Sequence, residues 1–281
     1  MRLAILFGQL GAADAELYGG RLAAPLRAAG LDVVITSLSA PDQLDGVDVA
    51  TPLLCWSYHT DENAWRASLE AVEAAGVPLI NPAELLLWNT RKTYLSTLQS
   101  AGADIVPTRF INAPTDSDIE AARQAFGGGT VVVKPQVSAG SKQTLRLAPG
   151  DRLRDGPTGP AMIQPFLDGI LTEGELSVFL FGGRFSHAVR KTPAAGDFRV
   201  QPQFGARLVP VEPPPGALDL ALAAIAAAPV PPVYARADMV RDAGGRLRLM
   251  ELELIEPDLY LQLAADGGAA FAGAMKAAMR G

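Results

Sequence analysis

The sequence predicts a parallel α/β domain followed by an α+β body. Strand-like and helix-like segments alternate over the first 85 residues, whereas strand-like segments joined by glycine turns dominate the remainder. Hydrophobic residues make up 49% of the chain and charged residues 19%, which suits a packed core and excludes a disordered chain. We expect the 281 residues to form three units, 1–85, 86–167 and 168–281.

The first unit is expected to hold a small parallel sheet. Strands that alternate with helices imply right-handed crossovers between parallel neighbours. In the second predicted helix, Trp65, Leu69 and Val72 recur at helical spacing and predict a buried face. The expected elements are a strand at 2–7, a helix at 15–30, strands at 32–38 and 48–54, a helix at 61–76 and a strand at 77–81.

The second and third units are expected to be rich in antiparallel hairpins. One long helix is predicted over 83–102, ending at Gly102, and another over 116–129. Glycine-bearing turns at Gly182-Gly183 and Ala243-Gly244 predict two hairpins. The expected strands cover 105–112, 127–136, 161–167, 175–191, 233–242 and 246–254.

Charge and cysteine content narrow the classes of function. The net charge of −6 excludes a globally basic surface for nucleic acid. Cys55 is the single cysteine, so no intramolecular disulfide can form, and two scattered histidines are too few for a zinc site. Any metal is therefore expected to be a hard ion bound by carboxylates.

No segment of the sequence has the pattern of a signal peptide or a membrane span. The longest weakly charged run, 216–233, carries Asp219 and ends in prolines, short of the roughly 20 apolar residues that cross a bilayer. We therefore expect a cytoplasmic protein whose partners are small molecules rather than nucleic acid or membrane.

The second hairpin carries an unusual concentration of acids. If it turns symmetrically, Asp238 pairs with Leu249 and Arg236 with Glu251. Alternation then puts the charged side chains on one face, which is either a solvated face with Arg236 as counter-ion or a divalent-cation site. The charged face would hold Arg236, Asp238, Glu251 and Glu253, and the apolar face Ala237, Met239, Met250 and Leu252.

Two lysines and a loop of small residues suggest an anion site. Lys134 directly follows three valines, and a lysine next to a buried run is unusual without a partner for its ammonium group. The segment 138–143, "SAGSKQ", is either a plain hairpin turn or a cradle for phosphate oxygens, and it is not a Walker A loop. Lys92 lies in a predicted helix, where it is either a solvated residue or a ligand-binding one.

Two further loops have the character of binding sites. Arg190, Lys191 and Arg199 surround a Pro/Gly-bearing loop, which is either an exposed basic loop or a clamp for phosphate or carboxylate. The segment 55–65, "CWSYHTDENAW", follows a strand end, where α/β domains bind ligands, although a partly buried aromatic loop is an equal alternative.

The order of these segments resembles the ATP-grasp superfamily. The similarity runs from "NPAELLLWNTRKTYL" to "MELELIEP" and is with glutathione synthetase, D-alanine–D-alanine ligase and, most closely, the cyclo-ligases of cycloserine biosynthesis that act on O-ureido-serine. The resemblance implies an ATP-grasp fold: residues 1–85 as the pre-ATP-grasp domain, 86–167 as linking helix and lid subdomain, and 168–281 as the C-terminal subdomain.

The resemblance also implies nucleotide-binding residues. Lys92 and Lys134 would contact the phosphates, and the small-residue loop would cover them. The segment 164–167 would grip adenine, and Glu175 would bind ribose, with Glu173 or Asp168 as substitutes. The implied set is Lys92, Lys134, Ser138, Gly140, Ser141, Gln164, Pro165, Phe166, Leu167, Glu173 and Glu175.

The implied catalytic and metal residues lie further along the chain. Arg190 and Arg199 would hold a carboxylate or the transferred phosphoryl group, with Arg236 beside the acids. Asp238, Glu251 and Glu253 would bind Mg²⁺, or alternatively Mn²⁺. The family has asparagine where this chain has Glu253, so Glu256 is a further candidate ligand.

The reaction implied by the resemblance is ATP-dependent carbon–nitrogen ligation through an acyl phosphate on a small amino-acid-like substrate, with intramolecular ring closure as one form. Two alternatives are a nucleotide-binding protein without turnover and a kinase-like phosphoryl transferase. A homodimer is an additional expectation.

Overall fold

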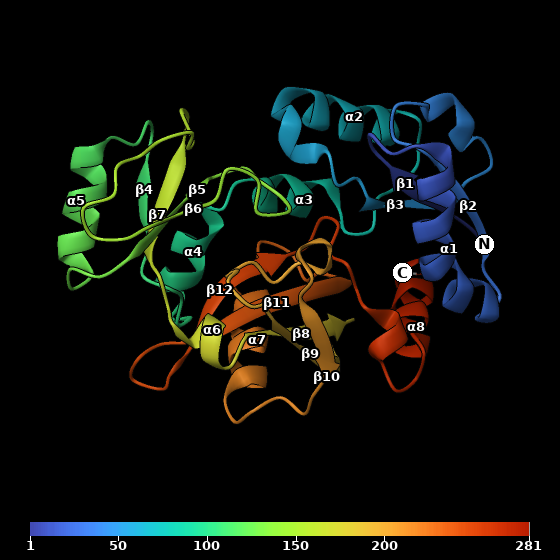
Figure 1. Ribbon diagram of the computed structural model, residues 1–281. Coiled ribbons are helices and arrows are strands. Elements are labelled where there is room, and N and C mark those ends of the chain that lie inside the picture. Colours follow the sequence, from blue (N-terminus) through green and yellow to red (C-terminus); the bar gives the residue numbers. More distant parts are fainter. Residues whose placement is uncertain (281) are drawn as a thin grey trace.

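The computed structural model describes residues 1–280, and their strands form three sheets (Figure 1). The first sheet is parallel, with the order β2-β1-β3. The apolar runs of β1 and β3 are largely buried, whereas Val34 and Ile35 of β2 are partly buried, and helix α1 joins β1 to β2 as the sequence predicts. The elements are β1 Arg2–Phe7, α1 Ala12–Ala28, β2 Asp32–Ser37, η1 Pro41–Leu44, β3 Val49–Leu54, η2 Tyr58–Thr60 and α2 Glu62–Ala74.

The second sheet is antiparallel, with the order β4-β7-β5-β6. Helix α5 covers it, because Ile119 and Ala122 pack on Val131 and Val133 of the central strand. Thr115 begins this helix with a capping box, satisfying backbone N–H groups of the first turn. The elements are β4 Arg109–Ile111, α5 Asp116–Ala125, β5 Val131–Pro135, β6 Leu145–Leu147 and β7 Ala161–Pro165.

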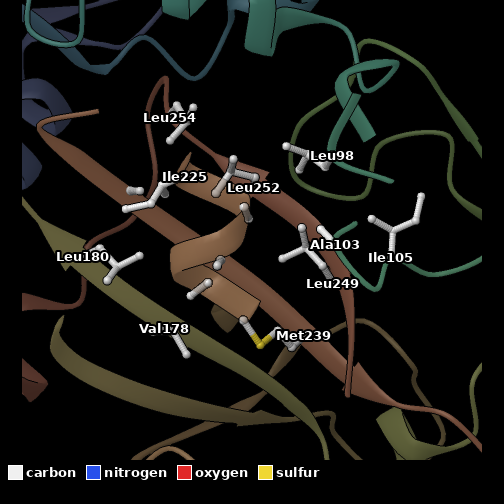
Figure 2. Packing of buried hydrophobic residues seen from close by; sticks show 14 of the residues in the cluster. Leu98, Ala103, Ile105, Val178, Leu180, Ile225, Met239, Leu249, Leu252 and Leu254 are labelled. Atoms are coloured by element: carbon white, nitrogen blue, oxygen red, sulfur yellow. The ribbon is translucent and has the colours of Figure 1, made fainter. Parts of the chain in front are cut away.

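The third sheet is antiparallel, with the order β10-β9-β8-β11-β12. Figure 2 shows one of its faces, where Met239, Leu249 and Leu252 pack together with residues of α7 and α4. Helix α8 leaves this region and packs against α1 of the first unit (Figure 1). The elements are α6 Gly169–Thr172, β8 Glu175–Phe181, β9 Arg184–Thr192, η3 Pro202–Phe204, β10 Arg207–Pro210, α7 Ala217–Ala226, β11 Tyr234–Arg241, β12 Leu247–Glu253, η4 Leu261–Leu263 and α8 Ala269–Ala278.

The fold class is confirmed: a parallel α/β sheet is followed by two antiparallel sheets. The sheets fall within residues 2–54, 109–165 and 175–253, and we propose to keep domain limits at 85/86 and 167/168. The predicted strand at 77–81 forms only one bridge, from Leu79 to Ala50. None of the helices in residues 1–280 combines the length and apolarity that a bilayer crossing requires.

The single long helix expected over 83–102 is wrong. The structure has two helices, α3 Ala83–Thr90 and α4 Tyr94–Ser100. Between them Arg91 is extended, at φ −103° and ψ 125°. The backbone N–H of Lys92 donates to the Gln136 carbonyl at 2.8 Å instead of to its own helix. This tertiary bond breaks the helix and directs the Lys92 side chain into the interior.

The symmetric register expected for the second hairpin is also wrong. Arg236 pairs with Glu253 and Asp238 with Glu251, and a β-bulge follows Asp238. Because the shift is by two residues, the charged side chains still share a face. Beyond the bulge, however, the side chains of β12 face the side opposite to the one expected.

Leu249 lies in the apolar cluster of Figure 2, whereas Met250 packs with Val240 on the opposite, charged side. The placement of Met250 on the apolar face is therefore a second error of the expected register.

Asn81 ties the first unit to the third sheet. Its fully buried side chain donates from Nδ2 to the carbonyls of Tyr234 (3.0 Å) and Leu254 (2.9 Å), and its Oδ1 accepts from the Val233 N–H (2.7 Å). Asn81→Ala would leave two buried carbonyls and one partly buried N–H without this partner, so we expect a loss of about 3 kcal/mol in the free energy of unfolding. Urea unfolding checks this value.

The exposed Asn63 on α2 supplies the matched control for that measurement. Asn63→Ala is expected to change the free energy of unfolding by less than about 0.5 kcal/mol. Equal losses in the two variants would contradict the anchoring role of Asn81.

His187 makes stability depend on pH. Its ring stacks on Phe179 at a centroid distance of 4.2 Å, and its Nε2 lies 3.1 Å from the Leu259 carbonyl. Burial lowers the His187 pKa from its ordinary 6.5, so the unfolded chain takes up the proton first as pH falls. Stability is therefore complete above pH 6.5 and decreases below it, by up to about 1.4 kcal/mol per pH unit.

Urea unfolding between pH 7.5 and 5 measures that dependence. His187→Gln keeps a hydrogen-bond donor but cannot titrate, and is expected to flatten the decrease. An unchanged slope in this variant would assign the acid sensitivity to other groups.

Candidate functional site

A cavity of about 1330 Å³ lies where the three sheets meet. The loop after β3 contributes Trp56 and Tyr58, β5 contributes Lys134, and the hairpin β11–β12 contributes Asp238 and Glu251. Residues from all three predicted units therefore line this one cavity. A cavity of this size holds a nucleotide together with a small second ligand.

The acid face of the hairpin is held together by Arg236. Its guanidinium donates to both oxygens of Asp238, at 3.0 to 3.2 Å, and to Glu253. The Ser177 hydroxyl also donates to Asp238 at 2.5 Å. Burial opposes the charged form of Asp238, but Arg236 and Lys191 together lower its pKa to about 2. Asp238 is therefore a carboxylate at neutral pH.

Lys191 is the residue of the basic loop that enters this cluster. It pairs with Glu175 and lies 3.5 Å from Asp238 Oδ1, and all three side chains are at most 4% exposed. Burial raises the Glu175 pKa to about 7, against the opposing effect of Lys191. The Glu175 carboxylate lines the cavity, where it is paired with Lys191.

Arg190 and Glu173, expected in the site, do not line the cavity. Successive β9 residues face opposite sides, so Lys191 points inward and Arg190 outward. Arg190 donates to the Glu173 carbonyl at 3.1 Å, and the Glu173 carboxylate pairs with Arg241 at 3.1 Å. This arrangement removes Arg190 and Glu173 from the candidate site. Lys191 belongs to the basic loop predicted from the sequence but was not among the expected catalytic residues, and it faces the cavity in place of Arg190.

Lys92 links the acid face to the small-residue loop. Its Nζ lies 3.0 Å from Glu251 Oε1 and donates to the Ser138 carbonyl at 2.7 Å. Burial raises the Glu251 pKa, but Lys92 and Lys134 outweigh it and the pKa is lowered. Glu251 thus stays ionised beside two lysines.

The side-chain ammonium group of Lys134 has no hydrogen-bond or ion-pair partner among residues 1–280, although the residue is only 9% exposed. Burial lowers its pKa, and Glu251 partly restores it. The loop opposite contains Gly140 and Ser141 at φ 61° and 59°, a left-handed pair that turns the chain back over the cavity. An ammonium group without a partner that lines the same cavity as such a loop is suited to an anionic ligand.

The opposite end of the cavity is apolar. Val106, Ile170, Val200 and Val240 form a small cluster against which Phe166, Leu167 and Met250 pack. The Gln164 amide donates to Thr108 at 2.9 Å beside it. This slot suits a flat aromatic ring such as a base. The sequence predicted the linker 164–167 here but missed Val240 and Met250, because the bulge that turns Met250 inward leaves no local signal.

Arg199 also lines the cavity. Its guanidinium binds Asp197 at 2.7 Å and lies 3.6 Å from the centre of the Phe204 ring. These contacts hold the Arg199 guanidinium against residues of its own loop. Arg199 is therefore the one arginine of the predicted clamp that the structure brings to the cavity.

The carboxylates of the site have the oxygen donors that Mg²⁺ prefers. Among residues 1–280, however, no group of three acidic, histidine or cysteine side chains is arranged to hold an ion. Instead, Arg236 forms ion pairs with Asp238 and Glu253, and Lys92 forms one with Glu251. The donor types fit a hard cation, with the remaining ligands left to water and phosphate oxygens. Glu256 lines the same cavity and has no ion-pair partner in the described residues.

Comparisons with known proteins agree with this architecture. The family described as D-cycloserine synthetase DcsG, N-terminal domain, matches residues 7–81. The chain is 30% identical to the cycloserine biosynthesis protein DcsG of Streptomyces lavendulae over 256 residues, covering 78% of this chain and 79% of that protein.

Solved structures share the whole fold. The crystal structure of D-cycloserine synthetase DcsG matches with a TM-score of 0.86 at 23% identity, over 99% of this chain and 100% of that one. A D-alanine–D-alanine ligase from Bacillus anthracis matches with a TM-score of 0.72 at 17% identity, over 99% and 95%. With the sequence relationship to DcsG, these matches show that the chain belongs to the ATP-grasp ligases, in the family of the cycloserine biosynthesis protein DcsG.

Proposed function

We propose that this ligase uses ATP and Mg²⁺ to join a carboxylate to a nitrogen nucleophile of a small amino-acid-like substrate, and that the two groups belong to one molecule. The observation that carries the proposal is Lys134, a largely buried residue whose ammonium group has no ion-pair partner among residues 1–280 and which lines the same cavity as the loop 138–143. The family relationship to a cycloserine biosynthesis protein supports the intramolecular form.

The chain's own residues suit each stage of such a reaction. The apolar slot around Phe166 and Met250 receives the adenine. Lys92 and Lys134 neutralise the phosphates, and phosphoryl transfer depends mainly on such charge and on positioning. Asp238, Glu251 and Glu253 would hold the metal ion, which when bound supplies charge neutralisation at the phosphate oxygens.

Two further features protect and hold the substrate. Arg199 orients the carboxylate that accepts the phosphoryl group, by a bidentate contact. The loop 138–143 excludes water from the acyl phosphate, which would otherwise hydrolyse.

An ADP-release assay with O-ureido-serine and a panel of small amino acids tests the proposal, with Mg²⁺ and Mn²⁺ compared. We expect substrate-dependent ADP release and a cyclic amide-type product in equal amounts. ADP release with a stable phosphorylated product and no new C–N bond would show a kinase-like transferase. No release with any substrate, despite ATP binding, would show a binding protein without turnover.

A further inference from the structure

The part of the cavity formed by the loop after β3 contains none of the residues assigned above to nucleotide binding. This loop runs from Cys55 to Asp61 and includes η2 Tyr58–Thr60. Trp56, Tyr58 and His59 all line the cavity, beside Tyr18 of α1. Because the adenine slot and the lysines lie on other elements, this end is where the second substrate group is expected.

His59 is fixed rigidly on that loop. Its Nδ1 lies 3.0 Å from the Trp56 carbonyl oxygen, which can only accept a hydrogen bond. Nδ1 therefore carries the ring proton, and Nε2 of the neutral ring is a bare acceptor. Hydrogen bonds from Tyr58 N–H to the Cys55 carbonyl and from Thr60 to the Ser57 carbonyl hold the surrounding turn.

The Nε2 atom of His59 is buried and has no hydrogen-bond partner among residues 1–280. The other buried side-chain atom without a partner in these residues is Gln201 Oε1, and Gln201 lines the same cavity. Both are acceptors, so the ligand that satisfies them brings N–H or O–H donors. Leaving such an atom unsatisfied costs about 1–3 kcal/mol, which a ligand would recover.

We propose that His59 is the general base of the ligation step, its Nε2 accepting the proton of the attacking nitrogen. The inference rests on the proposed function and deepens it. The nitrogen lone pair attacks the carbonyl carbon of the acyl phosphate and a C–N bond forms. The C–O bond to phosphate breaks, its electron pair leaves with the phosphate, and the N–H proton moves to Nε2. The imidazolium then returns the proton to solvent.

The surroundings of His59 keep the base form available. Burial lowers its pKa, and Lys142 of the loop 138–143 and Lys92 lower it further, against the raising effect of the Trp56 carbonyl. Tyr58 meets the ring edge-on at 5.9 Å. On the segment after β12, Glu256 lies close enough to raise the pKa of Tyr58. The ring is thus neutral and able to accept a proton at pH 7.

The tautomer of His59 gives a test independent of turnover. The chain contains two histidines, so ¹⁵N spectra of the imidazole rings resolve both, and His187→Gln assigns them. We expect His59 in the resting enzyme at pH 7 to be neutral with the proton on Nδ1. A proton on Nε2, or a charged ring, would overturn the proposal.

Turnover of O-ureido-serine gives the second test. His59→Ala is expected to slow cyclic product formation by about 100-fold or more, the range for loss of a general base. Acyl phosphate formation does not need this base, so trapping with hydroxylamine should still give hydroxamate within about threefold of the unaltered enzyme. The acid limb of the pH–rate profile should persist in His187→Gln, whose site lies outside the cavity.

If hydroxamate formation falls in parallel with product formation, His59 acts in substrate positioning or folding and the proposal is overturned. A product rate that falls less than threefold in His59→Ala would also overturn it. Failure of the proposed function looks different. The unaltered enzyme would then give neither ADP nor hydroxamate with any substrate of the panel, and this inference would fall with it.

Discussion

Replacing Lys134 with methionine is expected to lower kcat/KM by about 10²- to 10³-fold while leaving the unliganded protein as stable as the native chain, or more stable. Lys134 has no partner among residues 1–280, and burial lowers its pKa. Its charge therefore destabilises the free protein and is compensated only when an anion enters. Methionine keeps the volume and removes that cost.

Steady-state ADP release and thermal unfolding, each with and without ATP, measure the two effects. The stabilisation that ATP gives to the unaltered protein should be largely lost in Lys134→Met, since a ligand raises stability according to its affinity for the folded state.

Lys92→Met is the matched control, because Lys92 is also buried but pairs with Glu251 at 3.0 Å and with the Ser138 carbonyl. This variant should lose activity and also lose stability without ligand, by about 1–3 kcal/mol, since it leaves Glu251 with no cation within 4 Å. Equal destabilisation in both lysine variants would contradict the assignment of Lys134 to the ligand.

Glu251→Gln is expected to reduce kcat by about 100-fold or more. The substitution keeps the shape of the side chain but removes the charge that neutralises Lys92 and that would bind the metal ion. Asp238→Asn should act similarly, although Asp238 also binds Arg236, Lys191 and Ser177 and its loss should lower stability as well. ADP release as a function of Mg²⁺ concentration distinguishes the two roles.

In Glu251→Gln, a higher Mg²⁺ requirement is the expected result, together with a lower unfolding midpoint because the buried Lys92 ammonium group loses its carboxylate partner. Full activity of both acid variants at limiting Mg²⁺ would remove these residues from the metal site. Glu253→Asn provides a graded comparison, because it introduces the asparagine that the resemblance to the ATP-grasp superfamily implies at this position. We expect it to retain more activity than Glu251→Gln, with stability reduced by the loss of the contact from Arg236.

Local patterns in the sequence predicted much of the fold. Alternating apolar runs defined the strands, and the glycines at 182–183 marked a hairpin that the structure has between β8 and β9. The sharing of one face by Arg236, Asp238 and Glu251 also followed from strand alternation. It survived an error in register, because the real shift is by two residues and a shift of two preserves faces.

Other features depend on contacts between distant segments and left no local trace. The break between α3 and α4 exists because the Lys92 N–H bonds to Gln136, 44 positions later in the chain. The inward turn of Met250 follows from a bulge in the hairpin. The buried environment of His59, which was only one of several aromatic-loop residues in the sequence, depends on the loop and strand elements that close over it.

The sequence by itself determined the fold class, the order of the binding segments and the residue types available for chemistry, since these depend on periodicity and on neighbours along the chain. Only the tertiary structure decided which members of a segment reach the cavity: Lys191 rather than Arg190, and Met250 beside Val240. The reason is physical. Neighbouring residues on a strand face opposite sides, and only long-range pairing and bulges determine which side is the interior.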